Sequence, residues 1–264
     1  MSAASPIRIV RRHEIAWVIL DRPQVHNAFD DEVIAELHRT ADLLAQEADI
    51  RVVVLAGEGP SFSAGADVRW MQRMVGATEE ENKTDAKKMA RMFEAWNCLA
   101  KPVVGRIQGR ALGGGVGLAA ICDIVVASVD AEFGFTEIRL GILPAVISPF
   151  VLPKIGVSAA RELFLTGERF SAEKAREIGL VHYVVVPEKL DEEVERVIEK
   201  LLAGAPQAQA RAKRLLSFVP GKTPEEAREA TTRNIAEARA GAEGQEGLKS
   251  FLEKRRASWR RDTT

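Results

Sequence analysis

Two glycine-rich segments hold the residues whose types and spacing could do chemistry. They are Ser63-Ala64-Gly65-Ala66-Asp67 and Gly113-Gly114-Gly115-Val116-Gly117, and each follows an apolar run and precedes a predicted helix. Backbone N–H groups at such junctions lack a partner within the helix and favour negative charge. Two junctions on adjacent strands could each aim one N–H at a single oxygen and stabilise an oxyanion. The spacing alone also fits two ordinary strand-to-helix turns.

The elements that must position these segments alternate between strands and helices. An apolar helix face, built from positions 33, 34, 37, 41 and 44, follows a capping aspartate at 30 or 31. Continuous apolar runs are typical of strands that are buried on both faces. The order of strand and helix signals indicates an α/β fold. The predicted strands span 7–12, 15–20, 52–57, 102–109 and 124–128.

The segments outside these strands are predicted to be mainly helical. Residues 76–86 are polar and are predicted to be mobile, with a helix over about 86–99. Helices dominate from about 157, apart from one strand over 180–186, and Thr223 with Glu226 forms a capping-box pattern. Residues 204–264 have too few apolar positions for a core of their own. We therefore predict a core over 1–203 and a helical region over 204–264 that packs on the core or on a neighbouring subunit.

The composition excludes several functional classes. The 264 residues carry 37 basic and 38 acidic side chains, which leaves no basic surplus for nucleic acid. The two cysteines form no C-x-x-C pair, and the four histidines show no ligand spacing, so neither a disulfide framework nor a metal site is expected. The N-terminus lacks the pattern of a secretory signal, and the longest weakly polar stretch is too short to span a membrane. We expect a cytoplasmic protein.

Two other kinds of site are considered and set aside. Gly115, Gly117 and Ala120 match a dinucleotide fingerprint, with Glu137 lying 20 residues after Gly117. These glycines, however, fall inside the predicted helix start, and no doubly wound array follows. Ser61 and Ser63 lack the G-x-S-x-G setting of a serine hydrolase.

Five motifs in order show that the chain resembles the crotonase (enoyl-CoA hydratase/isomerase) superfamily. The resemblance covers about residues 7–220, and it is closest to bacterial methylglutaconyl-CoA hydratases through GGGVGL and TEIRLGILPAVISPFV. It implies a spiral of ββα turns with a C-terminal helical appendage, and trimers or pairs of trimers. The motifs are DRPQVHNAF, FSAGAD, GRALGGGVGLAAICDIVVAS, FGFTEIRLGILP and LTGERFSAEKAREIGLVHYVV.

The resemblance also implies the site residues. The oxyanion donors would be the N–H groups of Ala66 and Gly114, and the acid–base group would be Glu137. Coenzyme A would be part of the substrate, with no separate cofactor and no metal, and Arg22 would suit its phosphates. The other substrate-binding positions would be Val25, Ala64, Asp67, Val68, Leu112, Gly117, Thr136, Leu140 and Gly141.

The chain departs from the family pattern at one position. Two-carboxylate hydratases have a first glutamate where this sequence has Gly117, and Ala145 excludes the aspartate nucleophile of the dehalogenase branch. One interpretation is a hydratase of a 2-enoyl-CoA that is branched or carries a second carboxylate, with room for the acyl group beside Gly117. Another is a double-bond isomerase, in which a single glutamate moves the proton. A third is an acyl-CoA-binding protein without turnover.

Both key positions also have structural interpretations. Gly117 could simply allow a close helix contact, since glycine within a helix costs about 1 kcal/mol relative to alanine and needs a reason. Glu137 could pair on the surface with Arg139 or Arg161. The resemblance favours catalysis at Glu137.

Overall fold

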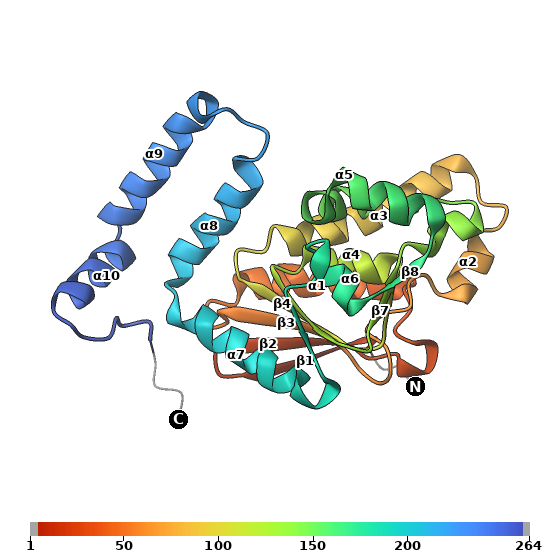
Figure 1. The fold of residues 1–264 in the computed structure, drawn as a ribbon, viewed down its shortest axis with the longest axis horizontal. Coiled ribbons are helices and arrows are strands. Elements are labelled where there is room, and N and C mark those ends of the chain that lie inside the picture. Colours follow the sequence, from red (N-terminus) through yellow and green to blue (C-terminus); the bar gives the residue numbers. More distant parts are fainter. Residues whose placement is uncertain (1–4, 261–264) are drawn as a thin grey trace.

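The main sheet of the molecule has six strands. The computed structural model describes residues 5–260. The antiparallel pair β1–β2 lies at one edge, and the remaining neighbours are parallel (Figure 1). In spatial order the strands are β1 (Ile7–Arg12), β2 (Ile15–Leu20), β3 (Val52–Gly57), β4 (Val103–Ile107), β6 (Ile124–Ser128) and β9 (Tyr183–Val185).

A second, smaller sheet lies beside the first. Its three strands are ordered β5-β7-β8, with β5–β7 parallel and β7–β8 antiparallel. The sequence prediction missed all three, because three-residue strands show no periodicity. Together the two sheets confirm the predicted α/β class. The strands are β5 (Arg110–Leu112), β7 (Glu132–Gly134) and β8 (Arg169–Ser171).

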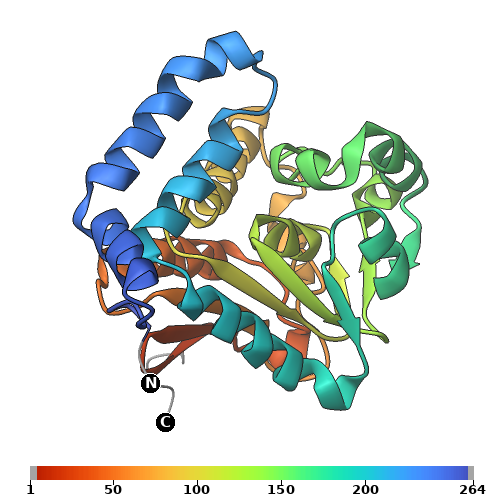
Figure 2. The same cartoon turned by 60° about the vertical axis from the view of Figure 1, so that its left-hand side comes forward.

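Helices cover both faces of the main sheet. In the central strand β3, Val53 and Leu55 belong to the core cluster that includes residues of α1, α3 and α4, whereas Val52 and Val54 belong to the cluster that includes residues of α7. Figure 2 shows helices on both sides of the sheet. Among the helices of residues 5–260, none is long and apolar enough to span a membrane. The helices of the body are α1 (Asp31–Gln46), α2 (Val68–Met74), α3 (Glu79–Asn97), α4 (Gly114–Ile121), α5 (Ser148–Thr166), α6 (Ala172–Glu177) and α7 (Leu190–Ala203), with short 3-10 turns η1 (Pro23–Val25), η2 (Thr136–Leu140) and η3 (Pro187–Lys189).

Several local predictions are confirmed and two are wrong. The Asp30 cap and the Thr223–Glu226 capping box are both present. The predicted mobile segment over 76–86 is wrong from residue 79 onward, because α3 begins at Glu79. Thr78 is its N-cap and forms a capping box with Glu81 in the first turn. The late strand is shorter than predicted, since only Tyr183–Val185 pairs, with β6.

The last three helices form an arm beside the body. They are α8 (Pro206–Phe218), α9 (Pro224–Ala240) and α10 (Ala242–Leu252), and Figure 1 shows α9 and α10 standing away from the sheets. The arm is fastened at α8, where Lys213 Nζ lies 2.6 Å from Asp123 Oδ2 and 2.9 Å from the Lys101 carbonyl oxygen. The division at 203/204 coincides with the end of α7 and stays a prediction.

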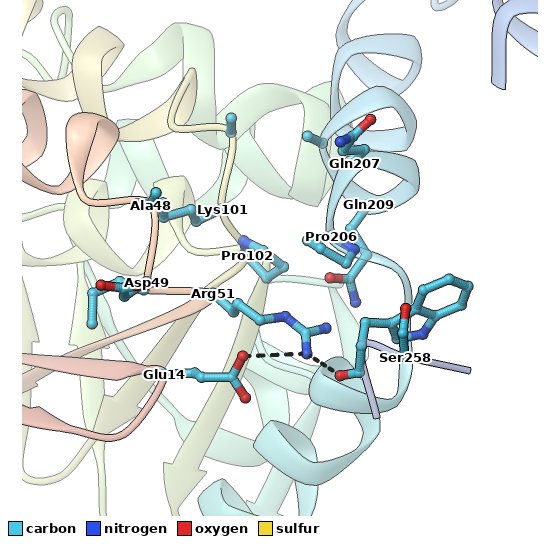
Figure 3. Close-up of a pocket in the computed structure, with 14 residues that line it drawn as sticks. Glu14, Ala48, Asp49, Arg51, Lys101, Pro102, Pro206, Gln207, Gln209 and Ser258 are labelled. Atoms are coloured by element: carbon cyan, nitrogen blue, oxygen red, sulfur yellow. Dashed lines mark hydrogen bonds and ion pairs between the residues drawn. The ribbon is translucent and has the colours of Figure 1, made fainter. Parts of the chain in front are cut away.

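A second attachment surrounds Arg51 (Figure 3). Its buried guanidinium donates to the carbonyl oxygens of Leu202, Gly204 and Trp259, and it lies 3.7 Å from Glu14. A cavity of about 380 Å³ lies beside it, between the body and the arm. None of the predicted site residues lines this cavity. Arg51 therefore fastens the chain end to the sheet, away from the glycine-rich loops.

Gly117 lies where three helices converge. A Cβ at this position would lie 2.4 Å from Ile147 Cγ2 and 2.8 Å from Phe93 Cζ, and both of these side chains are buried. Phe93 comes from α3 and Ile147 caps α5, so only glycine lets α4 approach both. The structure therefore favours the close helix contact, and the predicted room for a branched acyl group beside Gly117 is wrong.

We predict that Gly117→Ala destabilises the protein through overpacking, which typically costs about 1–3 kcal/mol. Ile147→Ala alone should also be destabilising, because it leaves a cavity. The double variant should be more stable than the sum of the two single effects predicts, since the removed Ile147 methyl group makes room for the new one. Urea denaturation of the four proteins measures this coupling, and strict additivity would contradict the contact.

Candidate active site

The two glycine-rich loops lie side by side. Ser63 pairs with Ala111 in a parallel bridge that joins the first loop to β5, immediately before the second loop. A Cβ at Gly65 would lie 2.9 Å from the Leu112 carbonyl oxygen, which leaves no room for any side chain there. The adjacency that the sequence suggested for the two loops is therefore present in the structure.

The Ala66 N–H is aimed by its own peptide plane. The Gly65 carbonyl accepts from the Phe29 N–H at 2.6 Å, and the Phe29 carbonyl accepts from Asp67 at 2.7 Å. In a planar trans peptide the N–H points opposite to the preceding C=O. The Ala66 N–H therefore points away from the Phe29 backbone, and within residues 5–260 it has no acceptor.

The Gly114 N–H is aimed in the same way. The Gly113 carbonyl accepts from Val116 at 2.9 Å and from Gly117 at 3.2 Å, so it points along α4. The Gly114 N–H consequently points out of the helix N-terminus, where negative charge is favoured, and it too has no acceptor in the described chain. Gly114 must be glycine, because a Cβ would lie 2.3 Å from the Phe29 ring. Sequence reasoning missed Phe29 as a determinant of this loop.

Glu137 brings a carboxyl group to the second loop. It sits in η2, and its Oε1 lies 3.2 Å from where a Gly113 Cβ would be. Its Oε2 is buried and has no hydrogen-bond partner among residues 5–260. No ion pair with Arg139 or Arg161 forms in the described chain, so the surface-pair interpretation is wrong.

Burial controls the charge of this carboxyl. Removal from water raises the pKa of Glu137 above its ordinary value of 4.5, and a hydrogen bond to its own backbone N–H lowers it by less. The net effect favours the neutral acid, which can donate a proton. Outward-pointing backbone N–H groups are the kind of donor that can stabilise an oxyanion, and a neutral carboxyl beside them is the kind of group that can protonate a neighbouring carbon.

The predicted acyl-CoA contacts fall into two groups. Val25, Ala64 and Ala66 are half-buried along the first loop, with the Ala64 N–H bonded to the His26 carbonyl, and Val68 is 63% exposed at the start of α2. Beside the second loop, the side chains of Leu112 and Thr136 both approach Gly134. Leu140 and Gly141 lie at the far end of η2, and both are exposed.

Two predicted contacts have structural partners instead. Arg22 is paired with Asp30 and Asp67, each at 2.9 Å, and also donates to the Ala28 carbonyl. Burial favours a raised pKa for Asp67, but hydrogen bonds from the Arg69 N–H and from Arg22 outweigh it and keep the pKa low. Asp67 also caps α2. The predicted role of Arg22 in phosphate binding is therefore not supported, because its guanidinium ties the 22–29 loop to the first glycine-rich loop.

Known proteins share this fold across nearly the whole chain. An enoyl-CoA hydratase structure from Shewanella pealeana is 36% identical, covers 96% of each chain and superposes with a TM-score of 0.93. An enoyl-CoA hydratase structure from Mycobacterium smegmatis is 31% identical, covers 97% of this chain and 99% of its own, and gives a TM-score of 0.92.

The sequence comparisons agree. The crotonyl-CoA hydratase of Syntrophomonas wolfei is 30% identical over 255 residues, which is 96% of this chain and 97% of the relative. The sequence profile of the enoyl-CoA hydratase/isomerase family matches residues 11–262. With the paired loops and the mixed α/β architecture, these matches establish that the chain belongs to the enoyl-CoA hydratase/isomerase, or crotonase, family.

Proposed function

We propose that this protein adds water to a 2-enoyl-CoA thioester. The observation that supports the proposal most directly is the position of Glu137, whose unpaired buried carboxyl lies against the loop that presents the Gly114 N–H. The proposal needs no cofactor, because coenzyme A belongs to the substrate. The free thiols Cys98 and Cys122 fit the reducing, cytoplasmic location that we also propose.

The chemistry follows from the two kinds of group. The thioester oxygen would accept from the Ala66 and Gly114 N–H groups, which stabilise the enolate formed when water attacks the β-carbon. Neutral Glu137 would give its proton to the α-carbon. The attacking water loses a proton to the carboxylate, so Glu137 is neutral again at the end of the cycle and one molecule of water has been added.

Two alternatives use the same site. An isomerase would move one proton between two carbons through Glu137. Such a mechanism needs only one carboxylate, so the glycine at position 117 is compatible with it. A binding protein without turnover gains nothing from a buried, unpaired carboxyl, which carries a desolvation cost. Assays with crotonyl-CoA and with a 3-enoyl-CoA distinguish the three.

The acyl group is a separate part of the proposal. The sequence resemblance suggests a branched or methylglutaconyl-type substrate, but Phe93 and Ile147 fill the space beside Gly117. We therefore propose an unbranched 2-enoyl-CoA and treat methylglutaconyl-CoA as the competing substrate to assay beside it.

The first functional prediction concerns Glu137→Gln. The amide cannot donate and accept the transferred proton, so turnover should fall by about 10²–10⁴-fold, the usual contribution of an acid–base group. Acyl-CoA binding should persist, because the loops are unchanged. The loss of 2-enoyl absorbance measures turnover, and calorimetry measures binding. Glu132→Gln is the matched control, since that exposed glutamate pairs with Arg169 nearby and should retain activity.

The same substitution should raise stability at neutral pH. A carboxyl whose pKa is higher in the folded state penalises folding as the pH rises from its unfolded value towards the folded one. The glutamine variant removes that penalty above this window and gains nothing below about pH 4.5, where both states of the wild type are protonated. Urea unfolding at pH 4 and pH 8 tests the sign; an equal difference at both values would contradict it.

The arm is proposed to mediate assembly into a trimer or hexamer. Its helices leave large apolar side chains uncovered, notably Leu216, Phe251 and Leu252, at 75%, 81% and 79% exposure. Such exposure is typical of a surface buried between subunits. We predict that the double variant Phe251→Asp/Leu252→Asp is smaller than wild type by light scattering, whereas Val186→Asp on the body is not. A monomeric wild-type protein at micromolar concentration would disprove the assembly.

A further inference from the structure

Ser63 lies at the junction of the two loops without touching either donor N–H. It is fully buried, and its backbone N–H donates to the Arg110 carbonyl while its carbonyl accepts from Leu112, both at 2.9 Å. These two bonds flank Ala111 and lock the first loop to β5. The second loop starts one residue after Leu112, so Ser63 is the shortest connection between the two donor segments.

The hydroxyl of Ser63 extends this connection to a third segment. Its Oγ donates to the Asn27 carbonyl at 2.8 Å and accepts from the Gly65 N–H at 3.4 Å. The second bond closes a tight turn that ends at Gly65. The Gly65 N–H belongs to the Ala64–Gly65 peptide, and the Gly65 C=O belongs to the next peptide, which carries the Ala66 N–H. Ser63 therefore holds the peptide that precedes the donor peptide, while the Phe29 N–H holds the donor peptide itself.

The segment that accepts from Ser63 is itself rigid. Asn27 is buried in the left-handed region with φ of 55°, after His26 at 53°. Its side chain accepts from the Arg22 N–H at 2.8 Å and donates to the Glu58 and Ser61 carbonyls at 2.9 and 2.8 Å. Such a conformation persists only where the surroundings hold it. The Ser63 hydroxyl thus bonds to a fixed point.

We propose that Ser63 is a positioning residue whose hydroxyl sets the direction of the Ala66 N–H relative to the Gly114 N–H. This inference rests on the proposed function, because it gives both N–H groups the thioester oxygen as their shared acceptor. Without the hydroxyl, the Gly65–Ala66 peptide keeps its bond to Phe29, but the preceding Ala64–Gly65 peptide loses its hydrogen bond to Ser63 and no longer restrains the donor peptide from its N-terminal side. The peptide plane can then rotate, and one donor of the pair is misaligned.

The experiment measures polarisation of a bound thioester as well as turnover. Cinnamoyl-CoA, a conjugated 2-enoyl thioester, should absorb at longer wavelength when two N–H groups polarise its carbonyl. We expect Ser63→Ala to lose most of this red shift at saturation and to lower kcat by about 10–100-fold, since small misplacements of a donor cost up to about 10²-fold. KM should change by less than about threefold, and Ser63→Cys, which keeps a weak donor of similar size, should lie between the two.

Ser128→Ala is the matched control. Ser128 is equally buried, in β6, and its hydroxyl has no partner within residues 5–260, so both readouts should match wild type. A Ser63→Ala protein that melts at lower temperature but keeps the red shift and kcat per folded molecule would overturn the positioning role. If the wild type itself binds cinnamoyl-CoA without any red shift, the proposed oxyanion site fails, and the role of Ser63 fails with it.

Discussion

The planarity of two peptide bonds is the constraint on which this site depends. The Gly65 and Gly113 carbonyls are each held by hydrogen bonds within the fold, and each therefore turns the following N–H outward. No side chain can adjust these donors afterwards, because their directions are set by the backbone. The architecture around them, with parallel strands that end at one edge and a helix that begins there, fixes two directions before any substrate arrives. Such preorganisation is what makes an oxyanion site effective.

Glycine is needed where the backbone of one loop lies too close to a neighbouring group to leave room for a Cβ atom. Gly65 meets the Leu112 carbonyl, Gly114 meets the Phe29 ring and Gly115 meets the Ser63 carbonyl. The 22–29 loop carries Phe29, and the Arg22 ion pairs fasten that loop to Asp67. A charge expected to face the phosphates of coenzyme A is thus used inside the protein. The first loop consequently has support on both sides, from the 22–29 loop and from β5.

The sequence predicted the parts of the molecule that local patterns encode. Continuous apolar runs indicated the main sheet, and the glycine-rich motifs indicated two loops that the structure places side by side. The catalytic roles of Ala66, Gly114 and Glu137 stay predictions. Contacts between distant segments left no such pattern. The Arg22 partner Asp67 lies 45 residues away along the chain. The neighbours of Gly117 come from α3 and the start of α5, and the strands of the second sheet are too short to show alternation. The start of α3 could have been predicted from the capping-box pattern of Thr78 and Glu81. The polar composition of the segment led to the prediction of a mobile segment instead.

The single carboxylate and the packing of α4 are two aspects of one arrangement. Phe93 and Ile147 occupy the volume that a side chain at residue 117 would enter, so a glutamate there would need both neighbours to move. The buried end of Glu137 meanwhile lacks an ionic partner among the described residues, and burial raises the pKa of this carboxyl. The absence of a carboxylate at residue 117 therefore leaves no cavity, because apolar side chains fill the space. Under the proposed function, Glu137 alone would both give and take the proton, and its raised pKa favours the neutral acid from which the proton is given.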